Sequence, residues 1–230
     1  LADRGIGEWG FAALVVVDGH RLLFDTGGRP DTVLDNAQAL GVDLSGIRDV
    51  ILSHNHWDHT GGLIRLREAY RASNPDALSR AHVGQGIFWP RPGQHAVSMT
   101  ERRARYEALG GEVIEYDGPA EIMPGVWLTG PVPRLYGEKN YGNPLRDGHP
   151  VGQVHSPDGV VDDNIPESMS LVINTEKGLV VISGCGHAGM INTLDYARKV
   201  VTQESGAPET VHAAVGGFHL LFASDDQLAW

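Results

Sequence analysis

Six consecutive residues, His54-Asn55-His56-Trp57-Asp58-His59, carry four side chains that commonly bind metal ions. They follow an apolar run, residues 49–53, which has the length and β-branched content of a buried strand. At strand spacing His54 and His56 point to the same side, so both can reach one ion. Asp58 and His59 lie past the strand end, where the turning chain can direct them at a second ion. Zinc and iron favour this mixture of imidazole and carboxylate ligands. The alternative is a histidine-rich surface loop without metal.

The pattern His54-x-His56-x-Asp58-His59-x-Gly61-Gly62 resembles the signature of the metallo-β-lactamase superfamily. The resemblance implies an α/β fold, a four-layer αββα sandwich of two mixed sheets with outer helices. It also implies a two-metal site at one edge of the paired sheets. Upstream, Asp25-Thr26-Gly27-Gly28 stands where the same superfamily carries an Asp-Thr-Gly, whose Asp supports the metal-binding loop without binding metal. The alternative for Asp25 is an ordinary turn, because Asp and Gly favour turns.

The elements that must position these residues can be predicted from hydrophobic periodicity and turn signals. Apolar runs predict a hairpin around Gly19-His20, and His82 in a later short strand is interpreted as structural. Short strands that follow helices, and then further strand–helix units, fit two packed sheets with outer helices. The expected helices are 30–41, 60–72, 100–109 and 190–202, and the expected strands are 11–18, 21–24, 49–53, 81–84, 112–116, 121–123, 126–130, 169–174, 178–183 and 211–215.

Two further strands are followed by ligand-type residues. The run 179–182 is apolar without interruption, as expected of a strand buried on both faces, and Cys185 and His187 follow it. His219 follows the last expected strand. In a sandwich the ends of adjacent strands meet at one edge, so we expect these residues and the first histidines to converge. A single histidine after a strand is more often structural, but the dense motif elsewhere in the chain favours metal ligands here.

Around these residues the resemblance becomes narrower. Ser183-Gly184-Cys185-Gly186-His187-Ala188-Gly189 with Asn192-Thr193, Gly216-Gly217-Phe218-His219-Leu220, and Leu128-Thr129-Gly130-x-Val132-Pro133-Arg134 are similar to the dihydropterin-ribofuranosyl-aminobenzene phosphate synthase-like branch. Cys185 stands where most superfamily members have a bridging Asp, which joins two hard ions better than a thiolate does. Asp163-Asn164-Ile165-Pro166-Glu167 stands where most members have a third His. Either an acidic residue there binds metal or His187 takes that role, and we favour His187.

Residues 131–168 form the longest stretch without periodicity, and a loop of this length inside a compact domain is usually functional or disordered. We expect Arg134, Tyr136 and His155 in this stretch to bind the substrate. The alternative is a solvated flap that takes no part in binding.

Composition excludes several classes of function. The net charge of −11, without a basic cluster, argues against a nucleic-acid partner. No apolar run approaches the roughly 20 residues of a membrane span. The single cysteine excludes an internal disulfide and fits a reducing compartment, so we expect a cytoplasmic protein.

The length fits one domain, residues 1–230, and homo-oligomerisation stays open. Because the chain starts at Leu1, removal of a signal peptide also stays open. Ser224-Asp225-Asp226 is typical of a helix start with four residues after it, so we expect a truncated C-terminal helix.

These observations predict a metal-dependent hydrolase that acts on a small-molecule phosphoester, lactone or other ester. Two divalent ions are expected, with zinc as the first choice and iron or manganese as alternatives. Asp58 is expected both to bind metal and to accept a proton during catalysis. The alternatives are a synthase acting on a phosphorylated ribosyl substrate, which the branch resemblance implies, and a non-catalytic metal-dependent sensor. The expected metal ligands are His54, His56, Asp58, His59, Cys185, His187 and His219.

Overall fold

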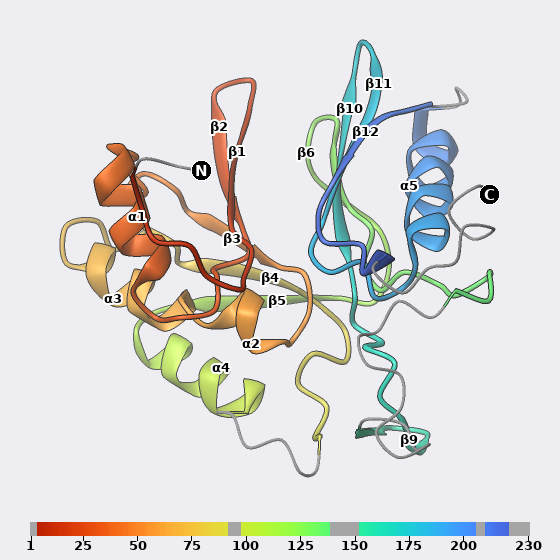
Figure 1. Ribbon diagram of the computed structural model, residues 1–230, viewed down its shortest axis with the longest axis horizontal. Coiled ribbons are helices and arrows are strands. Elements are labelled where there is room, and N and C mark those ends of the chain that lie inside the picture. The colour runs from red at the N-terminus through yellow and green to blue at the C-terminus, as the bar shows by residue number, and fades with distance from the viewer. Residues whose placement is uncertain (1–3, 92–97, 139–151, 206–209, 221–230) are drawn as a thin grey trace. The chain divides into compact units, whose positions relative to one another are not determined.

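A computed structural model describes residues 4–91, 98–138, 152–205 and 210–220. The chain divides into two compact units, residues 1–88 with 94–115, and residues 89–93 with 116–230. Each unit is built on one five-stranded sheet with both parallel and antiparallel neighbours (Figure 1). The predicted α/β class with two mixed sheets is therefore confirmed, while the single domain over residues 1–230 stays a prediction. Within the described ranges, no helix is both long enough and apolar enough to cross a membrane.

The sheet of the first unit has the strand order β1-β2-β3-β4-β5. β1 and β2 form an antiparallel hairpin, and β3 lies parallel to both β2 and β4. The crossover connections between these parallel strands carry helices, as parallel pairing requires. The strands are β1 (Ala13–Val17), β2 (His20–Phe24), β3 (Asp49–Leu52), β4 (Arg80–Gly84) and β5 (Glu112–Tyr116), and the helices are α1 (Thr32–Leu40), α2 (Trp57–Thr60), α3 (Leu63–Arg71) and α4 (Met99–Ala108).

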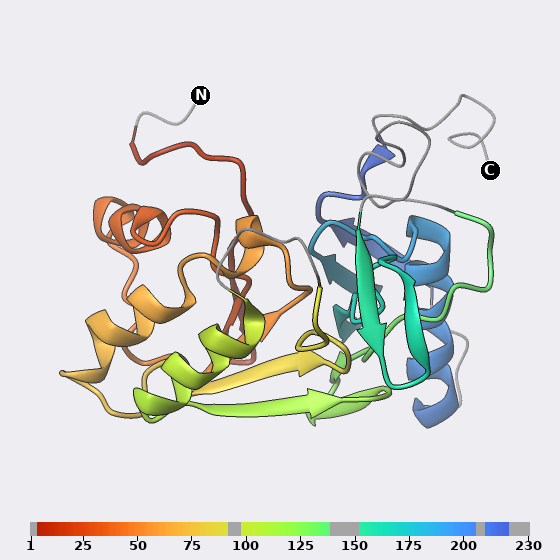
Figure 2. The same ribbon diagram turned by 90° about the horizontal axis from the view of Figure 1, so that it is seen from below.

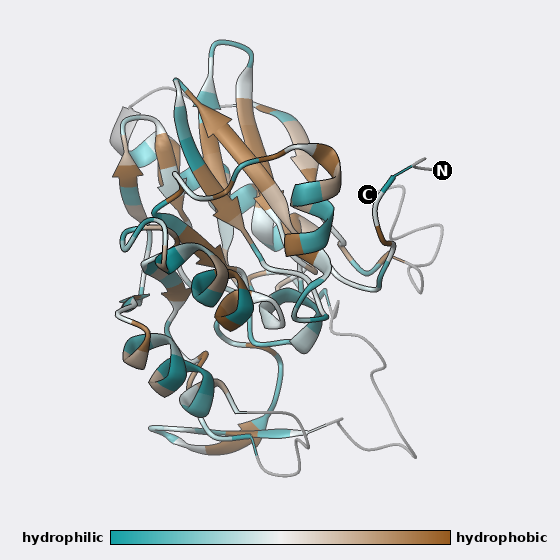
Figure 3. Ribbon diagram, turned by 90° about the vertical axis from the view of Figure 1, so that its left-hand side faces the viewer, coloured by the Kyte–Doolittle hydropathy of each residue, from teal (hydrophilic) through white to brown (hydrophobic). Residues whose placement is uncertain are grey.

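Helices α1, α3 and α4 pack their apolar faces on this sheet (Figure 2). Leu34, Leu66 and Tyr106, one from each helix, join the same buried cluster as Val50 of β3. In Figure 3 the helices carry both hydrophilic and hydrophobic residues, as expected of amphipathic helices that cover a sheet. Gly41 closes α1 in the left-handed conformation, as the sequence predicts, whereas the helix expected from Thr100 begins earlier, because Ser98 caps α4 with a capping box. The packed sheet thereby fixes the position of β3, and the histidine-rich loop follows the C-terminal end of this strand.

A polar cluster on β3 and β4 shows why His82 is structural. Its Nε2 donates to Asp49 Oδ1 over 2.8 Å, and Arg80 donates to the same carboxylate through Nε and Nη2. Burial alone would raise the pKa of Asp49, but the hydrogen bonds from His82 and Arg80 outweigh it and lower that pKa to about 2. The expectation that His82 is a structural histidine is therefore confirmed.

This cluster predicts a pH dependence of stability. The folded-state pKa of Asp49 lies below its ordinary value of 3.8, so the ionised carboxylate stabilises the fold above about pH 4. That contribution should be lost as the pH falls from about 4 to about 2. The free energy of unfolding of the wild type and of Asp49→Asn, measured from pH 6 to pH 2, should converge in this window. Two curves that stay parallel over the whole range would contradict the prediction.

The main sheet of the second unit has the strand order β12-β11-β10-β7-β6. β11 is antiparallel to β10 and parallel to β12, and helix α5 covers one face. Val172, Val181 and Ala197 form the centre of this packing. The elements are β6 (Ala120–Met123), β7 (Val126–Leu128), β10 (Ser170–Thr175), β11 (Gly178–Ser183), α5 (Met190–Ser205) and β12 (Val211–Val215), with a separate hairpin of β8 (Gln153–Ser156) and β9 (Gly159–Asp162).

Three sequence-based expectations need correction. Residues 131–168 are not a continuous loop, because the hairpin β8–β9 lies within them. The helix expected over 60–72 is present as α3 but begins at Leu63, and a separate short helix that was not expected, α2, precedes it. The hairpin turn lies at Asp18-Gly19, both with positive φ, so His20 already belongs to β2. The expected C-terminal helix and residues 139–151 of the long stretch lie outside the described residues.

Candidate metal centre

The histidine-rich loop of the first unit is organised by a fully buried carboxylate, Asp25. Its Oδ1 accepts the amide hydrogen of Ser53 over 2.7 Å, and its Oδ2 accepts the Ser53 hydroxyl over 2.7 Å. The same Oδ2 lies 2.6 Å from Nδ1 of His59. Asp25 follows β2 and Ser53 follows the parallel neighbour β3, so the pairing of the two strands brings these groups together. The expectation that Asp25 supports the loop is confirmed.

These hydrogen bonds set the ring tautomers of two histidines. Asp25 can only accept, so Nδ1 of His59 carries the hydrogen. Ser53 Oγ gives its hydrogen to Asp25 and therefore accepts from Nδ1 of His54, 2.9 Å away. We assign the Nδ1–H tautomer to both rings, which places each lone pair on Nε2, the atom that would bind an ion. A histidine held by a carboxylate through its other nitrogen is the usual arrangement around protein-bound metals.

Two glycines of the motif are needed for close packing. A Cβ atom on Gly61 would lie 1.8 Å from the carbonyl oxygen of Gly28, and one on Gly62 would lie 2.4 Å from that of Thr26. The amides of Gly61 and Gly62 donate to Gly27 and Thr26 across this contact. The loop after β3 and the turn after β2 are thus joined by backbone hydrogen bonds. The two backbones lie so close together that a residue with a Cβ atom would clash at either glycine.

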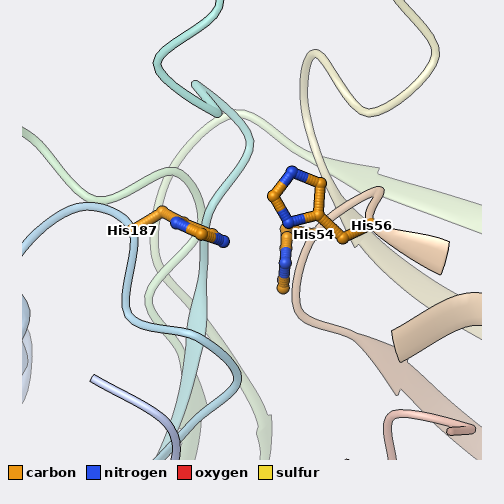
Figure 4. Close-up of side chains that lie close together, drawn as sticks. All are labelled: His54, His56 and His187. Carbon is orange, nitrogen blue, oxygen red and sulfur yellow. The ribbon is translucent and has the colours of Figure 1, made fainter. Parts of the chain in front are cut away.

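The potential ligands of this unit lie close together. The ring centroids of His54 and His56 are 4.6 Å apart, and those of His54 and His59 are 4.3 Å apart. Figure 4 shows the His54 and His56 rings beside each other on the loop after β3. Asp58 Oδ2 lies 3.5 Å from Nε2 of His59, and both side chains are buried. The structure therefore brings His54, His56, Asp58 and His59 together.

The second unit brings its three expected ligands together as well. Cys185 and His187 follow β11, and His219 follows β12, the parallel neighbour of β11. The potential ligand atoms of the three residues all lie within 4.8 Å of one another, and the rings of His187 and His219 are stacked with centroids 4.8 Å apart. The amide of Gly217 donates to the Gly184 carbonyl over 2.7 Å and joins the two loops. The expectation that these two strand ends deliver ligand-type residues to one place is confirmed.

The two acidic residues of the segment 163–167, Asp163 and Glu167, form ion pairs with Arg91. Arg91 Nε lies 2.6 Å from Asp163 Oδ2, and Arg91 Nη2 lies 2.6 Å from Glu167 Oε2. All three side chains are almost fully buried. A buried carboxylate that neutralises a guanidinium is a poor candidate for a metal ligand. The choice of His187 over an acidic residue as a metal ligand stays a prediction.

The three expected substrate residues lie in different surroundings. Arg134 Nη2 donates to the carbonyl oxygens of Asn164, Ile165 and His187. Tyr136 contacts helix α5, where its hydroxyl donates to Asp195 over 3.1 Å. His155 has an exposed side chain on β8. Substrate binding by these residues stays a prediction.

The donor sets of both units fit metal ions. Imidazole nitrogen, carboxylate oxygen and thiolate sulfur are the ligands of zinc and iron sites. The 4.8 Å limit on the Cys185–His187–His219 cluster is close to the span of two metal–ligand bonds of about 2.0–2.3 Å each. In the first unit, the hydrogen bonds of Asp25 and Ser53 fix the two rings so that Nε2 can coordinate.

Comparison with known proteins identifies the family. The profile of the metallo-beta-lactamase superfamily matches residues 10–164, which include the histidine-rich loop. The chain belongs to the metallo-β-lactamase superfamily. A solved structure, Tm1679, a metal-dependent hydrolase of the beta-lactamase superfamily, is 29% identical, with a TM-score of 0.69 over 99% of this chain and 76% of that chain. The predicted fold class, the αββα sandwich of this superfamily, is confirmed by these two matches.

Two curated relatives come from Methanocaldococcus jannaschii. The first is 7,8-dihydropterin-6-methyl-4-(beta-D-ribofuranosyl)-aminobenzene-5'-phosphate synthase, 29% identical over 231 residues that cover 96% of this chain and 74% of the relative. The second is an uncharacterised protein, 27% identical over 223 residues that cover 96% of this chain and 76% of the relative. The first relative supports the branch of the superfamily that the motifs around Cys185 and His219 indicate.

Several residues around the candidate centre could not be found from the sequence. Arg91 lies in a stretch without periodicity, and its partners are 72 and 76 residues further along the chain. Glu138 accepts hydrogen bonds from the amides of Ile191 and Asn192, which lie 53 and 54 positions further along the chain. Ser53 reads simply as the last residue of a strand. Among the residues around the centre, Asn192 was marked by the sequence, because it belongs to the Asn192-Thr193 motif of the family resemblance.

Proposed function

We propose that this protein is a metal-dependent hydrolase of small-molecule phosphoesters, lactones or other esters. The proposal is carried by the histidine-rich loop, in which Asp25 and Ser53 orient His54 and His59 for metal binding. His54, His56 and His187 would hold one ion, and Asp58, His59 and His219 the other, with Cys185 near them. The pairing of the two ligand sets rests on the site of the superfamily. Two bound divalent ions would lower the pKa of water toward about 7 and polarise the scissile carbonyl or phosphoryl oxygen.

The protein itself contributes orientation and proton transfer. Asp25 fixes the His59 ring from Nδ1, so that ring does not have to be ordered when substrate arrives. Asp58 is the proposed proton acceptor, because its carboxylate lies at the histidine cluster and can take a hydrogen from the attacking water. Arg134, Tyr136 and His155 are the proposed substrate-binding residues.

A substrate screen tests the proposal. Protein loaded with Zn²⁺, Fe²⁺ or Mn²⁺ should contain about two ions per chain and hydrolyse p-nitrophenyl phosphates, aryl esters or lactones. Elemental analysis that finds no metal after loading with any of the three ions would reject the hydrolase. Metal without hydrolysis of any class would favour a sensor or the synthase described next.

The 29% identical relative favours a second candidate, a synthase that acts on a phosphorylated ribosyl substrate. The same residues would then bind metal, and a phosphate-binding residue such as Arg134 would be essential. Metal-loaded protein that consumes a phosphorylated ribosyl compound only when an aminobenzene or dihydropterin co-substrate is present would support the synthase. Hydrolysis of simple esters in the absence of a second substrate would support the hydrolase.

Cys185 provides a direct test of the second ligand set, because it is the only cysteine. If its sulfur binds metal, the loaded protein should react with an alkylating reagent more slowly than the metal-free protein. Cys185→Ala should lower the metal content, and Cys185→Asp should retain metal with an altered preference between ions. The competing interpretation is a buried cysteine that packs as a small apolar group. Under that interpretation, alkylation is slow with or without metal and Cys185→Ala keeps its full metal content.

A further inference from the structure

Hydrogen bonds from the segment Arg134–Glu138 hold the loop that carries Cys185 and His187. The side chains of Arg134 and Glu138 and the backbone of Tyr136 reach the loop or the first turn of α5. Arg134 Nη2 donates to the carbonyl oxygen of His187 itself, at 3.4 Å. Tyr136 and Glu138 bond to Asn192, five residues beyond His187. All of these contacts lie within the second unit.

Asn192 is the centre of the connection. The residue is 2% exposed, and its Oδ1 accepts the amide of Tyr136 over 2.8 Å. Its Nδ2 lies within hydrogen-bonding distance of the carbonyl oxygens of Tyr136 (3.1 Å) and Ala188 (2.9 Å) and of Glu138 Oε2 (3.2 Å). Ala188 directly follows His187, so one buried amide joins the ligand loop to the segment. Losing a buried partner of this kind leaves polar groups unsatisfied at a cost of about 1–3 kcal/mol.

Glu138 binds the first turn of α5 through its carboxylate. Its Oε1 accepts the amide of Ile191 over 3.0 Å, and its Oε2 accepts the amide of Asn192 over 2.9 Å. These amides belong to the first turn, where a helix leaves its donors unpaired and where its dipole favours a negative charge. A Cβ atom on Gly189 would lie 2.4 Å from Glu138 Oε2, so the carboxylate packs directly against the last residue of the ligand loop.

The backbone of this loop contains two glycines that are costly to order. Gly186 and Gly189 both have positive φ, and glycine loses more conformational freedom on ordering than any other residue. Within the loop, the amide of Gly189 donates to the Gly186 carbonyl over 2.8 Å. A short loop with two such glycines therefore depends on contacts from neighbouring segments to keep His187 in one orientation.

We propose that Asn192 and Glu138 are positioning residues that hold the Cys185–His187 loop in its metal-binding geometry, an inference that rests on the proposed metal-dependent function. Neither residue binds the ion. They act through the backbone of Ala188, Gly189 and Ile191, while Asp25 acts on the first ligand set through the His59 ring. Changes to residues that orient metal ligands typically cost about 10–100-fold in metal affinity.

The test is a metal titration of full-length variants. Asn192→Ala and Glu138→Ala should each bind Zn²⁺ about ten-fold more weakly than the wild type at one of the two ions. Glu138→Gln keeps one acceptor oxygen and should fall between the wild type and Glu138→Ala. Glu121→Ala is the matched control, because Glu121 Oε1 also accepts a backbone amide, that of Gly125 over 2.7 Å, in a turn between β6 and β7.

A second measurement uses metal-free protein. Amide hydrogen exchange over residues 185–189 should be faster in Glu138→Ala than in the wild type and in Glu121→Ala, while exchange in β11 stays unchanged. If Asn192→Ala does not fold, Glu138→Gln and Glu138→Ala carry the test. Variants that lose thermal stability but bind Zn²⁺ like the control would overturn the positioning role. A wild type that binds no metal would reject the proposed function, and this inference with it.

Discussion

Replacing His56 with alanine is expected to abolish most of the metal-dependent activity while the fold survives. His56 would supply one of three nitrogen ligands to the first ion, and its ring lies 4.6 Å from that of His54. Changes that merely reorient ligands cost about 10–100-fold, so loss of a ligand should lower kcat/KM by more than about 100-fold. The measurement is kcat/KM on the best substrate of the screen, with metal content determined on the same sample.

His212→Ala is the control for this variant. His212 is an exposed histidine on β12, outside the ligand cluster of its unit, so its loss should leave both metal content and kcat/KM unchanged. Circular dichroism should show the same fold in both variants. Full activity in metal-loaded His56→Ala protein would remove this residue from the site.

Replacing Asp25 with alanine is expected to affect stability and metal binding together. The change leaves the Ser53 amide, the Ser53 hydroxyl and His59 Nδ1 without their acceptor in a fully buried place. Each unsatisfied buried group costs about 1–3 kcal/mol, so we expect about 3 kcal/mol or more of lost stability. Metal affinity should fall about 10–100-fold, since both His54 and His59 lose their fixed orientation.

Chemical denaturation of metal-free protein and a Zn²⁺ titration separate the two effects. Asp31→Ala is the control, because Asp31 forms an ion pair with Arg65 in which both side chains are largely exposed, and such pairs contribute about 0–1 kcal/mol. Asp25→Asn preserves the shape of the side chain but changes one acceptor into a donor. Its stability and metal affinity should therefore lie between those of Asp25→Ala and Asp31→Ala. Wild-type metal affinity in Asp25→Ala would show that the buried carboxylate is not needed to orient the ligands.

The strands that deliver ligands could be predicted from the sequence because they are buried runs with clear ends. β11 and β12 have the predicted bounds, and β3 ends one residue earlier than expected, two residues before His54. Their order in the sheet, with β11 beside β12, could not be predicted from the runs themselves. The candidate ligands were therefore predicted residue by residue, while the partners that orient them came partly from the resemblance, as with Asp25.

The missed features are short or depend on distant partners. Helix α2 has four residues, and strands β8 and β9 have four each, so periodicity has too few positions to reveal them. Val160 and Val161 of β9 are both about half exposed, so this strand lacks the alternation of a half-buried one. The hydrogen bonds of Glu138 and Arg91 join residues more than 50 positions apart, and no local signal in a single sequence marks such a pair.

The course of the chain at Arg91 limits how this protein can be divided into gene fragments. The polypeptide leaves the first unit after residue 88, and residues 89–91 belong to the second unit. A fragment that starts at residue 116 contains every strand of the second sheet, yet it lacks the guanidinium that neutralises Asp163 and Glu167. Breaking a buried ion pair by removing one partner costs about 3–5 kcal/mol, a large part of the stability of an ordinary domain. A split-protein reporter or a domain exchange should therefore carry residues 89–91 together with the second half.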